Sequence, residues 1–354
     1  MRVIAYYLPQ FHAIPENDEW WGRGFTEWTS VRNGKPLYAG HQQPVEPGEL
    51  GYYNLLDADV RERQATLAHE AGVEGFCYWH YWFGGKQLLE KPLQQVMESG
   101  KPDFPFCLGW ANESWKAKTW LDQQTAPDRM LIEQTYSEED DKAHFEAILP
   151  TLRDKRYIQV DGKPLLMVYR PFDLPDGKAW TARWQQMAKD AGFKGLYLLG
   201  HVAYQKQIES VLAMGFDAVN LVPLGDTKRN ICLALRHLPT LFRHLRGRSP
   251  LVYDYAKAIR VFASKVMKRE EVVPTILPGW DHSPRSRMRA FVMNNSTPEA
   301  FKSHVAAIKR IVDKKQNDLV MLKSWNEWGE GNYIEPDKRW GRQFLDALGT
   351  VQNR

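Results

Sequence analysis

Short apolar runs alternate with helical patterns along this chain of 354 residues. The apolar runs fall at residues 3–7, 73–79, 104–110, 164–169, 196–201, 217–220, 272–277 and 319–322. Helical spacing of apolar positions follows at residues 57–70, 88–98, 137–152, 178–191, 205–214, 250–266, 298–314 and 340–348. The runs are apolar throughout rather than alternating, which indicates parallel strands covered by helices. Eight such repeats predict an α/β fold, a single (β/α)8 TIM barrel. A doubly wound sheet would need an edge strand, and the pattern offers none.

Two longer segments interrupt this repeat and predict where the barrel is elaborated. A loop rich in aromatic and polar residues runs from the first strand to about residue 56, and loops this long in compact domains are usually functional. An insertion at about 223–249 follows the sixth strand, and its residues 228–248 hold six Lys or Arg, two His and no acid among leucines. This predicts an inserted amphipathic helix or hairpin, either simply solvated or in peripheral contact with an anionic membrane or an acidic glycan. The whole chain, residues 1–354, is then one catalytic domain with long loops at its C-terminal face.

Composition points to function more through aromatic residues than through charge. The chain has 14 Trp and 15 Tyr, many of them at predicted strand ends, which suggests a ring-lined cleft. A net charge of +4 and a pI of about 8.7 do not by themselves imply a nucleic-acid partner, and none is expected. Cys77 and Cys107 lie inside apolar runs, which predicts free buried thiols, and no Cys/His metal spacing occurs. The chain starts directly in a strand, without a signal peptide or a membrane-spanning run, so we expect a cytoplasmic location or association with a membrane through the basic insertion.

Polar and aromatic side chains gather where the predicted strands end, which is where active sites lie in this fold. The candidate substrate-binding residues at these ends are Tyr7, Gln10, His12, His80, Tyr81, Trp82, Trp110, Asn112, Glu113, His201, Trp280 and Asp281. The first long loop adds Glu27 and Trp28. Aromatic faces can stack on sugar rings, and the polar groups can bind sugar hydroxyls. Zinc binding by the three histidines and Asp281 is the alternative, but no short-range metal spacing supports it, so no metal is predicted.

The densest cluster follows the eighth strand, in residues 324–336. It holds six further candidates: Asn326, Glu327, Trp328, Glu330, Tyr333 and Glu335. Burying acids beside aromatic rings is costly unless the acids are used, and paired carboxyls can divide acid and base roles in glycoside chemistry. A turn here would let Glu327 and Glu330 face one cleft, so we predict them as the catalytic pair, ahead of Glu113 as a rival partner. The alternative is a charged exposed turn with incidental tryptophans.

Signals for other chemistries are weak. No GxGxxG or GxxxxGK[ST] sequence occurs, so phosphate-cradling loops are not predicted, and we expect no cofactor. Asp57-Ala58-Asp59 has the DxD form that metal-dependent glycosyltransferases use, but its position at a helix start favours a capping role. No GxSxG nucleophile elbow is present.

Several long motifs resemble the WbsX-type family. They lie at residues 6–12, 16–22, 24–28, 75–83, 110–113 and 325–331, the last reading Trp-Asn-Glu-Trp-Gly-Glu-Gly. That family is often labelled glycosyltransferase and occurs in bacterial surface-polysaccharide loci. It is related to glycoside hydrolase family 99, the endo-α-mannosidases and endo-α-mannanases. The resemblance covers nearly the whole chain and implies a (β/α)8 barrel that acts on α-linked glycans.

The resemblance also implies roles for the two acids. The related hydrolases carry an Asn-Glu-Trp-His-Glu-Gly motif, whose first Glu is a base on the sugar 2-hydroxyl and whose second Glu is the acid for the leaving oxygen. By match, Glu327 takes the first role and Glu330 the second. The reaction would pass through an epoxide-like intermediate and retain the anomeric configuration. This chain departs from the motif at Gly329, where the hydrolases have His, which puts the identity of the substrate in doubt.

These observations lead to one function and two alternatives. The leading hypothesis is a retaining, endo-acting glycoside hydrolase on an α-linked bacterial surface polysaccharide, so an oligosaccharide or polysaccharide is the expected partner. The first alternative is a glycosyltransferase in the synthesis of O-antigen or another surface polysaccharide. The second is a non-catalytic glycan-binding barrel. The sugar, its linkage and the oligomeric state are left open by the sequence.

Overall fold

The computed structural model describes residues 1–116, 129–233, 242 and 244–352. Its main sheet runs in the order β12-β10-β9-β8-β4-β2-β1-β16-β13, and every pairing along this path is parallel. The strands are β1 (Arg2–Tyr7), β2 (Val73–Phe83), β4 (Phe106–Trp110), β8 (Lys163–Val168), β9 (Tyr197–Val202), β10 (Ala218–Leu221), β12 (Val272–Val273), β13 (Thr275–Ile276) and β16 (Leu319–Leu322). All eight predicted strands are present, and the seventh consists of two short pieces, β12 and β13.

The division of the seventh strand at Pro274 accounts for how the barrel closes. β12 pairs with β10 on one side, and β13 pairs with β16 on the other. Proline has no backbone N–H to donate to a neighbouring strand, so a strand is readily interrupted there. The Pro274 carbonyl still accepts from the Met321 N–H at 3.0 Å. The short stretch 272–276 therefore joins the two ends of the sheet, and the predicted (β/α)8 barrel is confirmed.

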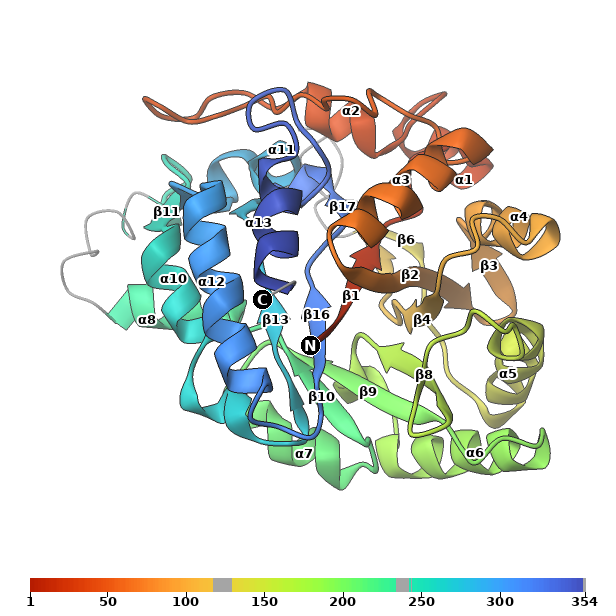
Figure 1. The fold of residues 1–354 in the computed structure, drawn as a ribbon. Coiled ribbons are helices and arrows are strands. Elements are labelled where there is room, and N and C mark those ends of the chain that lie inside the picture. The colour runs from red at the N-terminus through yellow and green to blue at the C-terminus, as the bar shows by residue number, and fades with distance from the viewer. Residues whose placement is uncertain (117–128, 234–241, 243, 353–354) are drawn as a thin grey trace.

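Helices surround the barrel at most of the predicted positions (Figure 1). They are α3 (Ala58–Glu70), α4 (Lys91–Ser99), α5 (Glu138–Leu152), α6 (Gly177–Asp190), α7 (Ile208–Ala213), α10 (Tyr255–Phe262), α12 (Pro298–Val312) and α13 (Gln343–Gln352). Asp57 caps α3 by accepting from the Asp59 N–H, which is the capping role favoured for the DxD sequence. Among the described residues, no helix is long and apolar enough to cross a membrane.

The prediction of a helix over 250–266 was wrong at its start. Residues 251–254 form β11 (Leu251–Asp254), which pairs with β15 (Phe291–Asn294) in a small second sheet. The run Leu-Val-Tyr at its beginning favours an extended backbone. β14 (Trp280–Asp281) completes this sheet by pairing with β15 in the antiparallel direction. The sheet holds Trp280 and Asp281 beside the end of the seventh strand.

The segments outside the repeat contain short elements. The first long loop holds α1 (Pro15–Trp21) and α2 (Glu27–Arg32). The basic insertion begins with α8 (Leu224–Leu233), and its residues 234–241 and 243 lie outside the described residues. Phe242 and Leu245, within the same insertion, are exposed. The remaining short strands are β3 (Lys86–Leu88), β5 (Trp115–Lys116), β6 (Met130–Ile132), β7 (Gln159–Val160), β17 (Asn326–Glu327) and β18 (Asn332–Tyr333).

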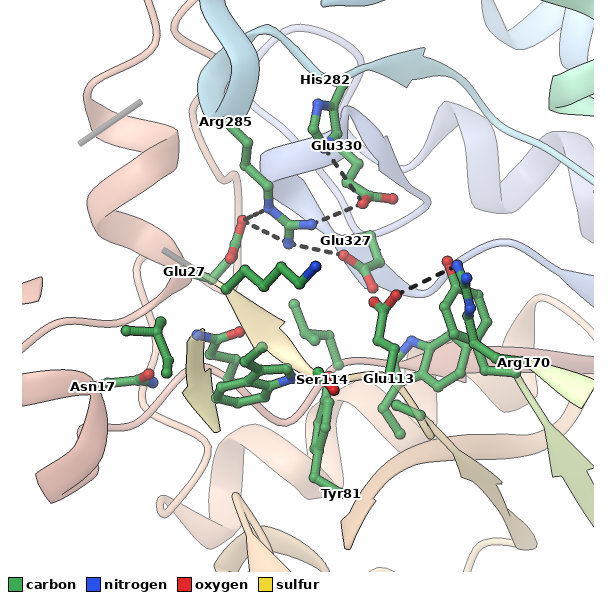
Figure 2. A pocket seen from close by; sticks show the side chains of 18 of the residues that line it. Asn17, Glu27, Tyr81, Glu113, Ser114, Arg170, His282, Arg285, Glu327 and Glu330 are labelled. Carbon is green, nitrogen blue, oxygen red and sulfur yellow. Dashed lines mark hydrogen bonds and ion pairs between the residues drawn. The ribbon is translucent and has the colours of Figure 1, made fainter. Parts of the chain in front are cut away.

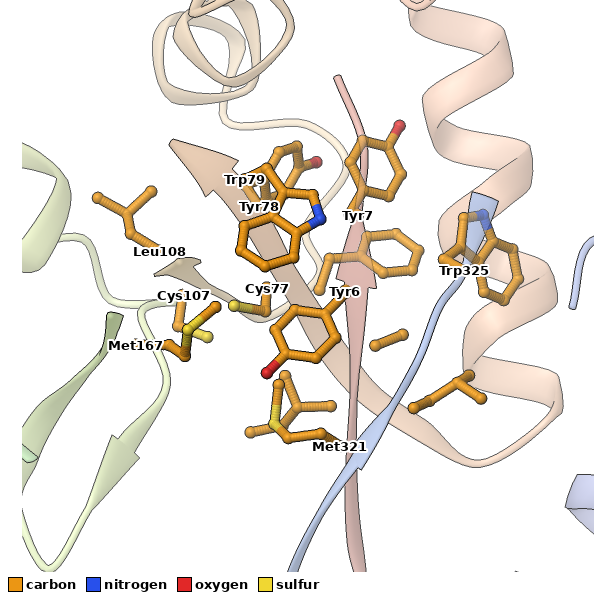
Figure 3. Close-up of a cluster of buried hydrophobic side chains, with 14 of the residues drawn as sticks. Tyr6, Tyr7, Cys77, Tyr78, Trp79, Cys107, Leu108, Met167, Met321 and Trp325 are labelled. Carbon is orange, nitrogen blue, oxygen red and sulfur yellow. The ribbon is translucent and has the colours of Figure 1, made fainter. Parts of the chain in front are cut away.

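Aromatic and sulfur-containing side chains fill the barrel beneath its C-terminal face (Figure 3). Tyr6 stacks on Trp79 with ring centroids 4.9 Å apart. Its hydroxyl donates to the Asn220 side chain at 2.7 Å on the opposite wall. Cys77 and Cys107 are buried and free, as predicted. The interior is thus a packed core that supports the residues above it, and not a channel.

Candidate functional site

The segment after β16 folds into a tight hairpin that presents both candidate acids. β17 pairs with β18 in the antiparallel direction, and the 3₁₀ turn η6 (Trp328–Glu330) lies between them. A 3₁₀ helix has three residues per turn, so positions i and i+3 lie on the same side. Glu327, which directly precedes the turn, and Glu330, which ends it, are three positions apart and face one cleft. The turn proposed from the sequence is present.

Buried polar groups fix this hairpin to the barrel. The Asn326 side chain accepts from the Leu8 N–H at 2.7 Å and donates to the Leu8 carbonyl at 3.0 Å. These two hydrogen bonds connect the segment after the eighth strand to the end of the first strand. Ser324 Oγ donates to the Asn332 carbonyl at 2.8 Å and accepts from the Glu327 N–H at 3.1 Å. The backbone of Glu327 is therefore held in place before any ligand binds.

The hairpin borders a cleft of about 750 Å³ at the C-terminal ends of the strands (Figure 2). Its aromatic lining residues are Trp21, Phe25, Trp79, Tyr81, Trp115, Tyr169 and Trp280. Its charged lining residues are Glu27, Glu113, Lys116, Arg170, Asp173, Arg285, Lys323, Glu327 and Glu330. Aromatic walls around a few convergent polar groups are typical of a carbohydrate-binding cleft.

Arg285 connects three acids of the cleft. It lies on α11 (Ser283–Ser286), and its Nε donates to Glu27 at 2.9 Å. Its Nη1 donates to Glu330 at 2.8 Å, and its Nη2 donates to Glu327 at 3.1 Å. Figure 2 shows the three carboxylates grouped around this guanidinium. A planar guanidinium suits this task because its donors have a fixed geometry.

Gly329 has no side chain, and this leaves room in the hairpin for Glu27. A Cβ atom at position 329 would lie 1.7 Å from Glu27 Oε1, far inside van der Waals contact, and 3.0 Å from Arg285 Nε. The Glu27 carboxylate, which is almost fully buried, thus occupies the space where a side chain at 329 would begin. This chain therefore has no side chain at position 329, where the hydrolase motif has His, and the Glu27 carboxylate of α2 occupies the adjoining space.

Burial and, after it, the neighbouring charge of Glu330 raise the pKa of Glu327 to about 7. Arg285 and Lys323 act in the opposite direction and lower it. A carboxyl with a pKa near neutrality can exchange a proton during a reaction at physiological pH. The Lys323 Nζ also lies 3.9 Å from Glu330 Oε2.

A second group of charges lies on the other side of the cleft. Arg170 Nη1 lies 3.7 Å from the Glu113 carboxylate, and Arg170 Nε donates to Asp173 at 2.8 Å. Asn112 orients this group, because its side chain accepts from the Arg170 N–H at 2.7 Å and donates to the Arg170 carbonyl at 3.0 Å. Burial, reinforced by the charges of Glu327 and Glu113, raises the pKa of Tyr81 well above its usual range. Tyr81 therefore remains a neutral hydroxyl that can donate to a ligand.

The structure brings some of the predicted site residues together in the cleft. These are Gln10, Glu27, Tyr81, Glu113, Trp280, Glu327 and Glu330. Asp281 and Tyr333 line a second cavity, which Trp280 also borders. The remaining predicted residues lie outside the cleft lining and contact other parts of the protein: Tyr7, His12, Trp28, His80, Trp82, Trp110, Asn112, His201, Asn326, Trp328 and Glu335.

Several of these residues point outward from their strands toward the helix layer. Tyr7 donates to Gln64 of α3 at 2.7 Å, and His80 Nε2 lies 2.8 Å from Nε2 of His144 on α5. Trp82 donates to Asp140 at 2.9 Å. Trp110 stacks with Trp180 and Trp184, which lie on α6. These residues stabilise the strand–helix packing below the cleft.

The others support the loops. His12 Nδ1 lies 3.0 Å from the Pro9 carbonyl, and His201 packs on Tyr169. Trp28 donates to the Tyr53 carbonyl at 2.8 Å and contacts the ring of Trp328. The histidines and Asp281 thus have separate partners. In the described part of the chain, no group of three or more His, Cys, Asp or Glu is arranged to hold a metal ion.

Glu335 lies beneath the hairpin, and its two oxygens receive three hydrogen bonds. Tyr53 Oη donates at 2.8 Å, Trp328 Nε1 at 2.6 Å and Gln64 Nε2 at 2.6 Å. Burial raises the pKa of Glu335 to about 7, and these donors limit the rise. The carboxyl joins the hairpin to α3 and to the first long loop.

We predict that Glu335→Gln lowers the free energy of unfolding by about 1–3 kcal/mol, because an amide offers one acceptor where the carboxylate offers two. Chemical denaturation at neutral pH measures the change. The control is Glu49→Gln, which removes an exposed ion pair with Arg342 and should change little. Equal stability of the Glu335 variant and the wild type would contradict a structural role.

Sequence reasoning missed several cleft residues, above all Arg285. Arg285 lies in the short helix that follows β14, and no motif in the sequence indicates that it contacts the acids of the hairpin. Lys323, Arg170 and Tyr169 had a usable signal, because each lies within two residues of the end of a barrel strand. Trp79 precedes His80 in the same strand and points to the opposite side. The alternation of side chains along a strand would have selected it.

The fold and the cleft define a class: a (β/α)8 barrel with paired carboxylates among aromatic rings at its C-terminal face, as in glycan-processing enzymes. The model of the WbsX glycosyltransferase family matches residues 3–348. The chain therefore belongs to the WbsX family of glycan-active enzymes.

Relatives and solved structures agree with this placement. Uncharacterized protein WxcX of Xanthomonas campestris pv. campestris, strain B100, is 37% identical over 358 residues, which cover 99% of this chain and 50% of the relative. The chain thus spans about half the length of the curated relative. The family 99 endo-α-mannosidase of Bacteroides thetaiotaomicron aligns with a TM-score of 0.60 at 13% identity, over 99% of this chain and 95% of that one. A glycoside hydrolase-like protein aligns with a TM-score of 0.58 at 16% identity, over 99% and 93%. These structures show a shared fold.

Proposed function

We propose that this protein is a retaining, endo-acting glycoside hydrolase that cleaves α-linked units of a bacterial surface polysaccharide. The observation that carries the proposal is the position of Glu327 and Glu330 on one turn, facing an aromatic cleft and sharing Arg285. Two carboxyls at such a site can supply the base and the acid that glycoside cleavage requires. The aromatic walls suit the faces of sugar rings.

The proposed reaction has two steps that use the same two acids. In the first, Glu327 takes the proton of the sugar 2-hydroxyl, the 2-oxygen attacks the anomeric carbon, and Glu330 protonates the departing glycosidic oxygen. In the second, Glu330 takes a proton from water, and the water oxygen attacks the anomeric carbon and opens the three-membered ring. Glu327 then returns its proton to the 2-oxygen. Two displacements at one carbon retain its configuration.

The test is a digest of purified surface polysaccharide from the source organism, in the absence of any nucleotide sugar. Mass spectrometry should show oligosaccharide fragments with the wild type. Each fragment should carry one ¹⁸O at its new reducing end when the water is H₂¹⁸O, because water supplies that oxygen. Intact polysaccharide after digestion with the folded wild type would contradict hydrolysis of that substrate.

A glycosyltransferase is the second candidate, and the description of the matching family favours it. Lys323, Arg285 and Arg170 supply positive charge in the cleft, which could face a diphosphate leaving group. This function predicts that a nucleotide sugar is consumed only when an acceptor glycan is present. Release of free nucleoside diphosphate, measured with a coupled assay, separates it from hydrolysis.

The pKa of Glu327 leads to a pH prediction. As a base, Glu327 must be ionised. We therefore expect kcat/KM to be low at pH below about 7 and to rise as the pH increases through that value. Arg285 lowers this pKa, so Arg285→Gln should move the rise to higher pH in addition to reducing the rate. The measurement is kcat/KM against pH for both proteins.

Arg289→Gln is the matched control, because Arg289 is an exposed arginine outside the cleft lining. Its pH profile should coincide with that of the wild type. The opposite dependence, with kcat/KM falling as pH rises through about 7, would assign Glu327 as the acid and overturn the assignment of roles.

A further inference from the structure

A second cavity, of about 770 Å³, lies next to the cleft on the same end of the barrel. It is bordered by the loop at residues 38–46, by the second sheet, and by the segment from Gly331 to Phe344. Trp280 lines both the cleft and this cavity. Trp280 therefore forms a wall that the cleft and the second cavity share.

The second cavity has the same kind of surface as the cleft. Four partly exposed aromatic side chains line it in addition to Trp280: Tyr38, Tyr333, Trp340 and Phe344. Its volume is within the range of ordinary ligand sites. Aromatic residues at a solvent-accessible wall are a means of holding sugar rings by their apolar faces.

A hydrogen-bond acceptor with a fixed position, the carboxylate of Asp281, lies among these rings. The Asp281 carboxylate accepts from Gln43 Nε2 at 2.6 Å and from the Ser283 N–H at 2.9 Å. His41 Nε2 lies 2.8 Å from the same carboxylate, and His41 Nδ1 accepts from the Leu37 N–H, which places the ring proton on Nε2. Although burial opposes it, hydrogen bonding from His41 lowers the pKa of Asp281, so the group stays ionised. An ionised, immobile carboxylate suits sugar hydroxyl donors.

The charges of the cavity favour a neutral ligand over an anionic one. Asp281 and Asp337 both contribute carboxylates to its lining. The two cations at its rim have partners: Lys338 pairs with Glu46, and Arg339 lies over the ring of Trp340. A nucleotide or phosphate would meet net repulsion here, whereas uncharged sugar units would not.

We infer that the second cavity is a distal sugar-binding subsite. A single glycan chain would be cleaved at Glu327 and Glu330, and its further sugar units would bind in this cavity. The inference rests on the proposed function for the identity of the ligand. An enzyme that cleaves within a chain must hold units on both sides of the cut, and this cavity extends the binding surface beyond Trp280. Affinity should then increase when an oligosaccharide becomes long enough to reach it.

The experiment measures binding without cleavage. The probes are oligosaccharides of graded length, prepared by partial acid hydrolysis of the source organism's surface polysaccharide and titrated calorimetrically into the Glu330→Gln variant. Adding Trp340→Ala should weaken binding of long oligosaccharides by about tenfold, which corresponds to about 1.4 kcal/mol, and leave short ones unchanged, because only the long ones lose an aromatic contact. Tyr38→Ala, in the loop at residues 38–46, should have the same selective effect. Because the two residues lie in different segments, agreement between the two variants excludes a local folding defect as the cause.

Phe172→Ala is the matched control, because Phe172 is an exposed aromatic residue outside both cavities. It should bind long and short oligosaccharides as the parent does. Affinity that is independent of length, or unaffected by both cavity substitutions, overturns the subsite.

The outcomes separate this inference from hydrolysis itself. If the wild type releases no fragments but length-dependent binding is still lost with Trp340→Ala, hydrolysis fails and the subsite stands. If the wild type cleaves the polysaccharide and neither cavity variant alters binding, hydrolysis stands and the subsite fails.

Discussion

Glu330→Gln is expected to slow release of oligosaccharides by about 10²–10⁴-fold, the usual contribution of a positioned general acid or base. The amide keeps the size of the side chain but cannot protonate the departing oxygen or activate water. Glu330 lies at the end of the 3₁₀ turn with its carboxylate on Arg285, so the substitution leaves the hairpin anchors at Asn326 and Ser324 intact. Initial rates on the purified polysaccharide measure the loss, and circular dichroism verifies the fold.

An aryl glycoside of the same sugar tests the role of the acid directly. A dinitrophenolate leaves without protonation, so the first step on this substrate should be nearly unaffected in the Glu330 variant. Glu113→Gln is the control, because Glu113 is another acid of the cleft, paired with Arg170 and outside the catalytic turn. It should reduce the rate much less than Glu330→Gln. A larger loss with Glu113→Gln would move the acid role to Glu113.

Gly329→Ala is expected to lower activity by about 10²-fold and the free energy of unfolding by about 1–3 kcal/mol. The added Cβ would lie 1.7 Å from Glu27 Oε1, so the carboxylate must leave its place beside Arg285. Arg285 would then lose one of its three acids, and the alignment of the catalytic pair would change. The measurements are kcat/KM on the polysaccharide and chemical denaturation.

A double-mutant cycle isolates the cause of this effect. Glu27→Ala removes the group with which the new Cβ collides, so Gly329→Ala should destabilise the Glu27→Ala background much less than the wild type. Coupling between the two positions follows directly from their contact. Additive stability changes would show that the collision with Glu27 is not the cause of the effect.

The fold was predictable because its strands are continuous apolar runs, which is a strong signal for a covered parallel sheet. All eight strand positions were found, including the seventh, which Pro274 divides into two pieces. The second sheet was not predictable, because residues 251–254 directly precede a helix and fit its first turn equally well. Local pattern alone does not distinguish these, since the strand forms only by pairing with residues 291–294.

The site was predictable to the extent that strand ends meet at one face. That reasoning placed Gln10, Glu113 and the acids of the hairpin at one cleft. It did not take into account that successive side chains of a strand point to opposite sides. Tyr81 faces the cleft, while its neighbours His80 and Trp82 face α5.

Arg285 shows what sequence reasoning cannot supply. Its position depends on the turn after β14 and on the approach of α2, which are far apart in the chain and meet only in the folded protein. The same is true of the space at Gly329, which Glu27 fills from more than 300 residues away in the sequence. Contacts of this kind have no local pattern.

Proton NMR of the earliest products is the most direct test of the central claim, that Glu327 and Glu330 hydrolyse an α-linked glycan with retention. The wild type would be mixed with the polysaccharide, without any nucleotide sugar, and the new anomeric signal would be followed before mutarotation. The α-anomer should appear first, and it should be absent with Glu330→Gln. First appearance of the β-anomer would contradict the two-step mechanism, and the absence of any new reducing end with the wild type would contradict hydrolysis.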